Sequence, residues 1–185
     1  MRFMTNSNSY TVPGLSTDQG ARVAALLQDR LNAYNDLHLT LKHIHWNVVG
    51  PNFISVHEML DPQVEAVRGF ADDVAERIAT LGSAALGTPG TIVKERSWDD
   101  YSIGRATAIE HLGALDLVYV GVIGDTRKAI AEIGEIDPVT EDLLIGQSGQ
   151  LELFHWFVRA HLENSGGQLS TAGASSETEA ASNAG

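Results

Sequence analysis

The chain has 185 residues, with 24 Asp or Glu against 12 Lys or Arg, and therefore carries a formal net charge of −12. A hydrophobic fraction of 43% supports a buried core, whereas no apolar run approaches the ~20 residues that cross a bilayer. The absence of cysteine excludes disulfide scaffolds, thiolate metal sites and cysteine nucleophiles, and the acidity argues against broad electrostatic binding of nucleic acid.

The N-terminal segment, residues 1–15, is polar and is expected to be flexible. It lacks the basic and apolar regions of a secretory signal, which favours a cytoplasmic location. A capping box at Ser16 then starts an amphipathic helix whose apolar positions continue to Val48. Gly-Pro-Asn at residues 50–52 breaks this helix, and a second apolar series extends over residues 56–81. The short break predicts an antiparallel hairpin of the two helices.

The second half of the sequence predicts two further long helices. Residues 82–101 contain Gly and Pro and are long enough to cross a whole bundle. Helical periodicity returns over residues 112–133, and Asp-Pro marks the start of a fourth helix at residues 137–164. Residues 168–185 are rich in Ser, Ala, Thr, Gly and Glu and are expected to form a flexible tail. The prediction is an all-α four-helix domain over residues 16–167, with a crossover between the second and third helices.

The second helix carries a polar stripe about 120° away from its apolar face. The stripe consists of His57, Asp61, Asp72 and Glu76. These residues form two i,i+4 pairs, and imidazole with carboxylate suits iron, manganese or zinc. A solvated helix face is the alternative interpretation. The midpoints of the pairs lie about 22 Å apart along the helix, so one chain cannot close a site from both. Two antiparallel copies of this helix, related by a twofold axis, could close such a site at each end. His45 lies near the interhelical turn and would join His57.

These residues also carry a family resemblance. The pattern is His45-Trp46-Asn47-x-x-Gly50-x-x-Phe53-x-x-x-His57-x-x-x-Asp61, followed by Asp72-x-x-Ala75-Glu76-Arg77. It resembles the signature of the Dps family, the miniferritins or DNA-binding proteins from starved cells, and several stretches are similar to actinobacterial members. The resemblance covers roughly residues 12–167. It implies a ferritin-like four-helix subunit with a short helix in the crossover, assembled as a hollow homododecamer.

The resemblance further implies a ferroxidase centre between twofold-related subunits. Such a centre oxidises Fe(II) to Fe(III), preferably with hydrogen peroxide, and the cage stores ferric oxyhydroxide and so protects DNA from oxidative damage. Carried over by position, one subunit would supply His45, His57 and Asp61. Its twofold mate would supply Asp72 and Glu76.

Further residues have roles that the resemblance implies less specifically. Trp46 would lie close to the iron, where it would quench stray oxidants or simply pack at the subunit interface. The acids at the start of the fourth helix, Asp137, Glu141 and Asp142, correspond to the region that lines threefold pores, and Asp142 is the best match. The favourable position of acids at a helix N-terminus is the alternative explanation.

Three other patterns fit a metal site less well. Glu152-x-x-His155 resembles half of a di-iron motif, but it occurs once, which favours helix surface or interface. The run His57–Asp61 resembles a zinc-protease helix, but an aspartate stands where the second histidine belongs. The single histidines expected to be structural are His38, His43, His111 and His161.

The termini argue against direct DNA binding. No Lys or Arg follows Arg159, and the N-terminal segment offers only Arg2 and the terminal amine. Because affinity for duplex DNA depends on neutralised phosphates, we expect weak or no direct binding at physiological salt. The alternative function is a nucleoid-associated architectural protein that compacts DNA, with iron chemistry secondary. A metal-free acidic helical interaction module is a third hypothesis, but it leaves the paired polar stripe unexplained.

Overall fold

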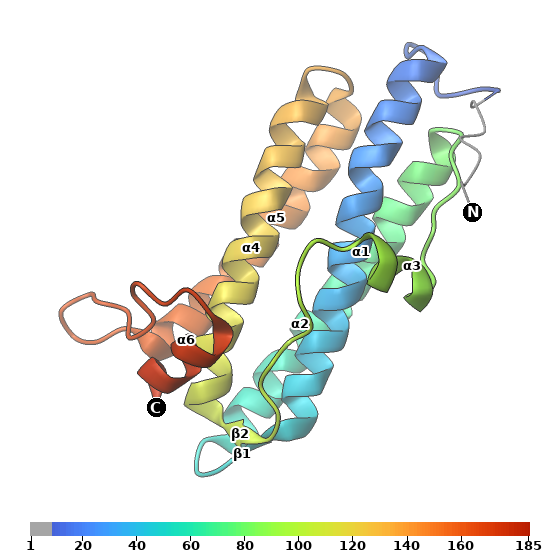
Figure 1. Ribbon diagram of the computed structural model, residues 1–185. Helices are drawn as coiled ribbons and strands as arrows, with labels where there is room; N and C mark the ends of the chain where they lie inside the picture. Colours follow the sequence, from blue (N-terminus) through green and yellow to red (C-terminus); the bar gives the residue numbers. More distant parts are fainter. Residues whose placement is uncertain (1–8) are drawn as a thin grey trace.

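The computed structural model describes residues 9–185 (Figure 1). The helices are α1 (Thr17–Asn47), α2 (Phe53–Thr80), α3 (Pro89–Glu95), α4 (Ala108–Gly134), α5 (Pro138–Leu162) and α6 (Glu177–Ala184). The strands β1 (Val48–Val49) and β2 (Ala106–Thr107) pair in parallel. The four long helices form the predicted bundle, and most of the N-terminal segment expected to be flexible, residues 1–8, lies outside the described residues. None of the described helices is long and apolar enough to cross a membrane.

The α1–α2 hairpin forms where the sequence predicts it. Ser16 caps α1 reciprocally with Gln19: its hydroxyl accepts from the Gln19 N–H, and the Gln19 side chain accepts from the Ser16 N–H. Gly50 turns the chain with a φ of +96°, a conformation that glycine adopts without strain. The apolar positions of both helices then meet in the core, as the 3.6-residue period requires.

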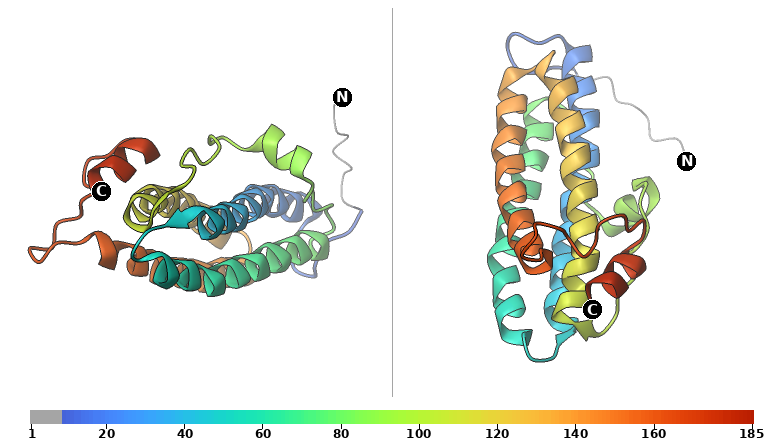
Figure 2. Two further views of the ribbon diagram at one scale, coloured as in Figure 1. Left: turned by 90° about the horizontal axis from the view of Figure 1, so that it is seen from below. Right: turned by 90° about the vertical axis from the view of Figure 1, so that its left-hand side faces the viewer.

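The crossover from α2 to α4 is held against α1 by polar contacts. Asp36 on α1 accepts one hydrogen bond from Arg96 at 3.2 Å and one from the Trp98 indole at 2.8 Å. The crossover ends where β2 pairs with β1, which places the start of α4 beside the end of α1. Figure 2 shows the crossover and α6 on the face of the bundle that α1 and α4 make.

The C-terminal residues differ from the flexible tail that composition predicts. Helix α6 packs on α4, with Ala180 and Ala181 buried (Figure 2). Gly113 on α4 makes this packing possible, because a Cβ there would lie 2.5 Å from the Ala180 carbonyl oxygen. The small residues of this segment therefore allow a close contact between two helices. The sequence of α6 alone does not show that α4 is the helix it packs on.

A buried carboxylate ties the same segment to the bundle. Asp116 on α4 accepts hydrogen bonds from His155 at 2.6 Å, Arg159 at 3.0 Å and Thr171 at 2.7 Å. His155 is only 7% exposed, so the interpretation of Glu152-x-x-His155 as helix surface is wrong for the histidine. Burial alone would raise the pKa of Asp116, but these hydrogen bonds outweigh it and lower the pKa to about 2.

We expect Asp116→Asn to lower the free energy of unfolding by about 2 kcal/mol at pH 7, because the three donors lose a charged acceptor. A depressed pKa stabilises the fold fully above the ordinary aspartate value of 3.8, and the effect is lost as the pH falls through about 2. The difference between wild type and variant should therefore shrink between pH 4 and pH 2 in urea denaturation. Asp125→Asn, which removes an exposed partner of Lys128, is the matched control. A difference that does not change with pH would contradict the role of the ionised carboxylate.

Candidate metal centre

The structure brings His45 and His57 together across the α1–α2 turn. His45 lies in the last turn of α1 and His57 near the start of α2. Their imidazole rings are stacked, with centroids 3.5 Å apart and an interplanar angle of 22°. The ring of Phe53 lies 4.9 Å from that of His57, so the pair has an apolar neighbour.

Two reciprocal hydrogen bonds fix the orientation of both rings. His45 Nδ1 lies 2.9 Å from the His57 carbonyl oxygen, and His57 Nδ1 lies 2.9 Å from the His45 carbonyl oxygen. A carbonyl oxygen only accepts, so each Nδ1 carries a proton, and in the neutral form of each ring Nε2 has the lone pair that can bind a metal. Neither Nε2 has a hydrogen bond to any residue that the structure describes. Orientation of a ligating imidazole through its other nitrogen is the usual arrangement in metal sites.

Asp61 adds a carboxylate one helical turn after His57. Its Oδ1 lies 3.3 Å from His45 Nδ1 and accepts a hydrogen bond from Lys42 Nζ at 2.9 Å. The Lys42 hydrogen bond is the main cause that lowers the pKa of Asp61, and the two histidines add to it. The half-exposed carboxylate therefore stays ionised beside the imidazoles. Sequence reasoning missed Lys42, although it precedes His45 by three residues and so shares its helix face.

Asp72 and Glu76 lie on the same helix but far from the histidine pair. Helix α2 is continuous from Phe53 to Thr80, so Pro62 does not shorten the separation of about 22 Å. Both side chains are exposed, and neither carboxylate has an ion pair or hydrogen bond among the described residues. Within residues 9–185 of a single chain, no group of three His, Asp or Glu side chains is arranged to hold a metal ion. A centre built from all five residues therefore requires a second copy.

The acids at the start of α5 differ in burial: one is buried and hydrogen-bonded, and two are at least partly exposed. Asp137 is 4% exposed and caps α5, accepting from the Val139 N–H, from Thr140 and from Arg77 at 2.7 Å. Burial opposes its ionisation, but the hydrogen bonds from Thr140 and Arg77 lower its pKa below the ordinary value. The prediction that Asp137 lines a pore is therefore wrong, because its oxygens hold α2 against α5. Glu141 is half-buried and Asp142 exposed, and for these two pore lining stays a prediction.

The single histidines mostly have structural partners, as predicted. His43 bonds to the Ile103 carbonyl oxygen at 2.9 Å, which ties the crossover to α1. His111 bonds to the Tyr101 hydroxyl at 3.0 Å, and His161 bonds to a backbone carbonyl in its own helix. Trp46, by contrast, is 71% exposed beside the histidine pair. Nothing within the described part of one chain covers this indole.

The fold and the paired imidazoles define a ferritin-like helical bundle, and a family model described as Ferritin-like domain matches residues 24–165. The chain is 64% identical over 176 residues to the "DNA protection during starvation protein" of Mycolicibacterium smegmatis, covering 95% of this chain and 96% of that protein. The chain belongs to the Dps family of ferritin-like proteins.

Two solved structures support this assignment. "Mycobacterium smegmatis Dps tetragonal form" superposes with a TM-score of 0.88 at 65% identity, covering 89% of this chain and 99% of that one. "DpsA14 from Streptomyces coelicolor" gives a TM-score of 0.87 at 66% identity, covering 88% of this chain and 97% of that one.

The Lys42–Asp61 ion pair predicts competition between the ammonium group and a bound cation. We expect Lys42→Met to strengthen binding of a divalent cation by about two- to fivefold, the value of a partly exposed ion pair. Isothermal titration with Co(II), which peroxide-free buffer does not oxidise, measures this directly. Lys128→Met, which removes the same charge elsewhere, is the control. Unchanged or weaker binding would show instead that Lys42 orders Asp61 for the metal.

Proposed function

We propose that the protein is a ferroxidase and iron store that consumes hydrogen peroxide. The observation that carries this proposal is the pair His45 and His57, held by two reciprocal hydrogen bonds, with the ionised Asp61 3.3 Å from His45 Nδ1. Neutral imidazole nitrogen and carboxylate oxygen together form a donor set suited to Fe(II). Membership of the Dps family supports the same chemistry.

A twofold-related copy would complete each centre with Asp72 and Glu76. Two α2 helices that pack antiparallel about an axis near Val67 bring the acids of one chain to the histidines of the other, at both ends. Gly69 lies on the exposed side of α2 at this level, where the absence of a side chain lets two helices approach closely. Exposed apolar residues next to the α1–α2 turn would be covered by the same contact; they are Trp46, Phe53 and Ile54.

The chemistry follows from holding two Fe(II) ions at one site. Each Fe(II) gives one electron, and hydrogen peroxide takes both together with two protons, so that two Fe(III) and two water molecules result. This paired reaction avoids the one-electron reduction that releases hydroxyl radical. The Lys42 ammonium occupies Oδ1 of Asp61, so Fe(II) that binds this carboxylate would compete with the ammonium for that oxygen. Trp46, exposed beside His45, would intercept stray oxidants or pack against the second copy.

Storage of the ferric product requires a closed assembly, and we propose the hollow homododecamer. Helix α5 carries an exposed apolar stripe that the single bundle leaves uncovered. Its residues are Ile145, Leu153 and Trp156, spaced at helical intervals. Such a stripe on the surface of an otherwise acidic chain supports further contacts between copies.

Protection of DNA would be chemical, through removal of iron and peroxide. Residues 163–185 contain no Lys or Arg, carry Glu163, Glu177 and Glu179, and pack partly on α4. Together with the net charge of −12 per chain, this leaves no basic tail among the described residues to neutralise phosphates. No observation in the structure favours the architectural alternative, in which the protein compacts DNA.

The shared centre can be tested by complementation. We expect Asp72→Ala or Glu76→Ala to slow peroxide-driven Fe(II) oxidation at least ~10-fold, as does His57→Ala, because each removes a ligand. Co-assembly of His57→Ala chains with Asp72→Ala chains should restore about a quarter of the centres, since one of the two sites in each mixed pair is then intact. Stopped-flow absorbance of Fe(III) formation measures the rates.

Glu58→Ala, which removes an exposed acid of the same helix, is the control and should oxidise iron at the wild-type rate. Sedimentation verifies that every variant assembles. Full activity in the Asp72 and Glu76 variants would refute the assignment. Absence of recovery in the mixture would refute the sharing of sites between chains.

If the protein does not bind DNA directly, the assembled protein should not shift the mobility of linear duplex DNA in a gel. The assay is run without divalent cations, at low and at physiological salt. A variant with Ser182→Lys and Asn183→Lys, both at exposed positions of α6, should shift the same DNA at low salt and so shows that the assay detects a basic tail. A wild-type shift that survives physiological salt would contradict the hypothesis and reveal a basic patch on the folded surface.

A further inference from the structure

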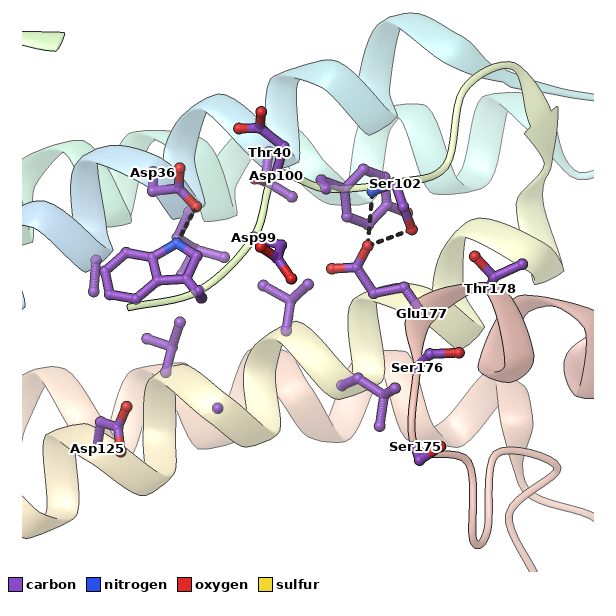
Figure 3. Close-up of a pocket in the computed structure, with 18 of the residues that line it drawn as sticks. Asp36, Thr40, Asp99, Asp100, Ser102, Asp125, Ser175, Ser176, Glu177 and Thr178 are labelled. Atoms are coloured by element: carbon purple, nitrogen blue, oxygen red, sulfur yellow. Dashed lines mark hydrogen bonds between the residues drawn. The ribbon is translucent and has the colours of Figure 1, made fainter. Parts of the chain in front are cut away.

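A groove of about 600 Å³ lies between α1, α4, the crossover and the segment before α6 (Figure 3). It is separate from the iron half-site at the α1–α2 turn, and the ferroxidase chemistry does not use it. Its walls are Leu37 of α1 and Leu117, Val118 and Val122 of α4, and the Trp98 ring also lines it. These walls favour an apolar chain as occupant.

Two carboxylates at the groove lack compensating charge. Asp99 has no ion pair or hydrogen bond among the described residues, and Glu177 uses only Oε2, which accepts from the Ser102 N–H and hydroxyl. Figure 3 shows both carboxylates directed into the space between the crossover and α4. The other acids of the groove are already paired: Asp36 and Asp100 with Arg96, and Asp125 with Lys128. The uncompensated pair therefore favours a cation at this part of the groove.

A buried cation of the same groove lacks a carboxylate partner. Arg30 on α1 is 6% exposed, and it has no ion pair within 4.0 Å among the described residues. Its hydrogen bond to the Thr126 hydroxyl, at 3.5 Å, is long and leaves most of the guanidinium donors unused. An unpaired buried charge is costly, and a ligand carboxylate would neutralise it with two parallel hydrogen bonds.

We infer that this groove binds an aliphatic ω-amino acid in extended form. The ammonium group lies between Asp99 and Glu177, the methylene chain covers Leu37 and Val118, and the carboxylate bonds to Arg30. The groove residues of α1 extend from Arg30 to Thr40, about 15 Å of helix, so a long chain fits and a compact α-amino acid does not span both poles. Opposite charges at the two poles distinguish this ligand from a polyamine, which would place a second ammonium near Arg30.

The inference can be tested by titration calorimetry on the assembled full-length protein. The probes are 8-aminooctanoate, octylamine, octanoate and spermidine, which separate the contribution of each pole. We expect saturable binding of 8-aminooctanoate, and at least tenfold weaker binding of the other three. Octylamine or spermidine binding as tightly would overturn the proposal, because the groove would then be a simple cation site. Absence of saturable heat with 8-aminooctanoate would also overturn it, including the case in which another copy covers the groove.

Variants locate the binding. Asp99→Asn combined with Glu177→Gln should weaken 8-aminooctanoate at least tenfold while preserving the shapes of both side chains. Gly121→Leu should abolish binding, because Gly121 lines the groove and a Cβ there meets no atom within 4 Å, so the added side chain starts in open space and takes up groove volume. Gly124→Leu, on the same helix but outside the groove, where a Cβ likewise meets no atom within 4 Å, should bind as wild type. Binding that survives Gly121→Leu would place the ligand elsewhere and refute the inference.

Discussion

Helix α2 is a continuous rod of 28 residues, and this rigidity determines how the proposed iron chemistry can be organised. The rod holds the His57 turn and the Asp72–Glu76 turn on one side but too far apart to share an ion. A flexible linker between them would let one chain fold a complete centre, whereas a rod cannot. The separation therefore links the proposed catalysis to assembly: a lone subunit offers two incomplete half-sites, and a symmetric pair offers two complete ones. This arrangement would keep unassembled chains from oxidising iron outside a cage.

Within the half-site, formed by His45, His57 and Asp61, backbone carbonyl groups orient the two imidazole rings. The carbonyls of His45 and His57 each hold the other ring, so the tautomer is set by main-chain atoms at the junction of two helices. The arrangement depends on the tight turn at Gly50, because only a short connection brings the last turn of α1 beside the first turn of α2. The ligand geometry is thus a consequence of the hairpin, and a change in the turn would alter both nitrogens together.

The sequence predicted what depends on local periodicity and missed what depends on distant partners. The four long helices follow from apolar spacing, and the meeting of His45 with His57 follows from the short break between helices. The packing of α6 was missed because its complement is the absence of a side chain at Gly113, some 65 residues earlier. Asp137 was misassigned for the same reason: Arg77, which neutralises it, is 60 residues away in the sequence. Helical periodicity predicts the helix face on which a residue lies, but it does not predict the residue's ion-pair partner.

The hydrogen-bond and ion-pair partners of each acid therefore say more about its role than the total number of acids does. The net charge of −12 counts every acid in the same way, although the acids differ in their surroundings. Asp116 and Asp137 are buried, and donors from other helices neutralise them, so these two carboxylates stabilise the fold. Among residues 9–185, Asp72 and Glu76 have no such donors, and the fold holds them at the surface without compensating charge from that part of the chain. A carboxylate that the fold leaves unpaired is expected to attract a cation, and both proposals depend on this: iron at α2 and an ammonium group beside Asp99. The same unpaired charge repels phosphate, so the proposed attraction of iron and the predicted weak affinity for DNA would have a common electrostatic origin.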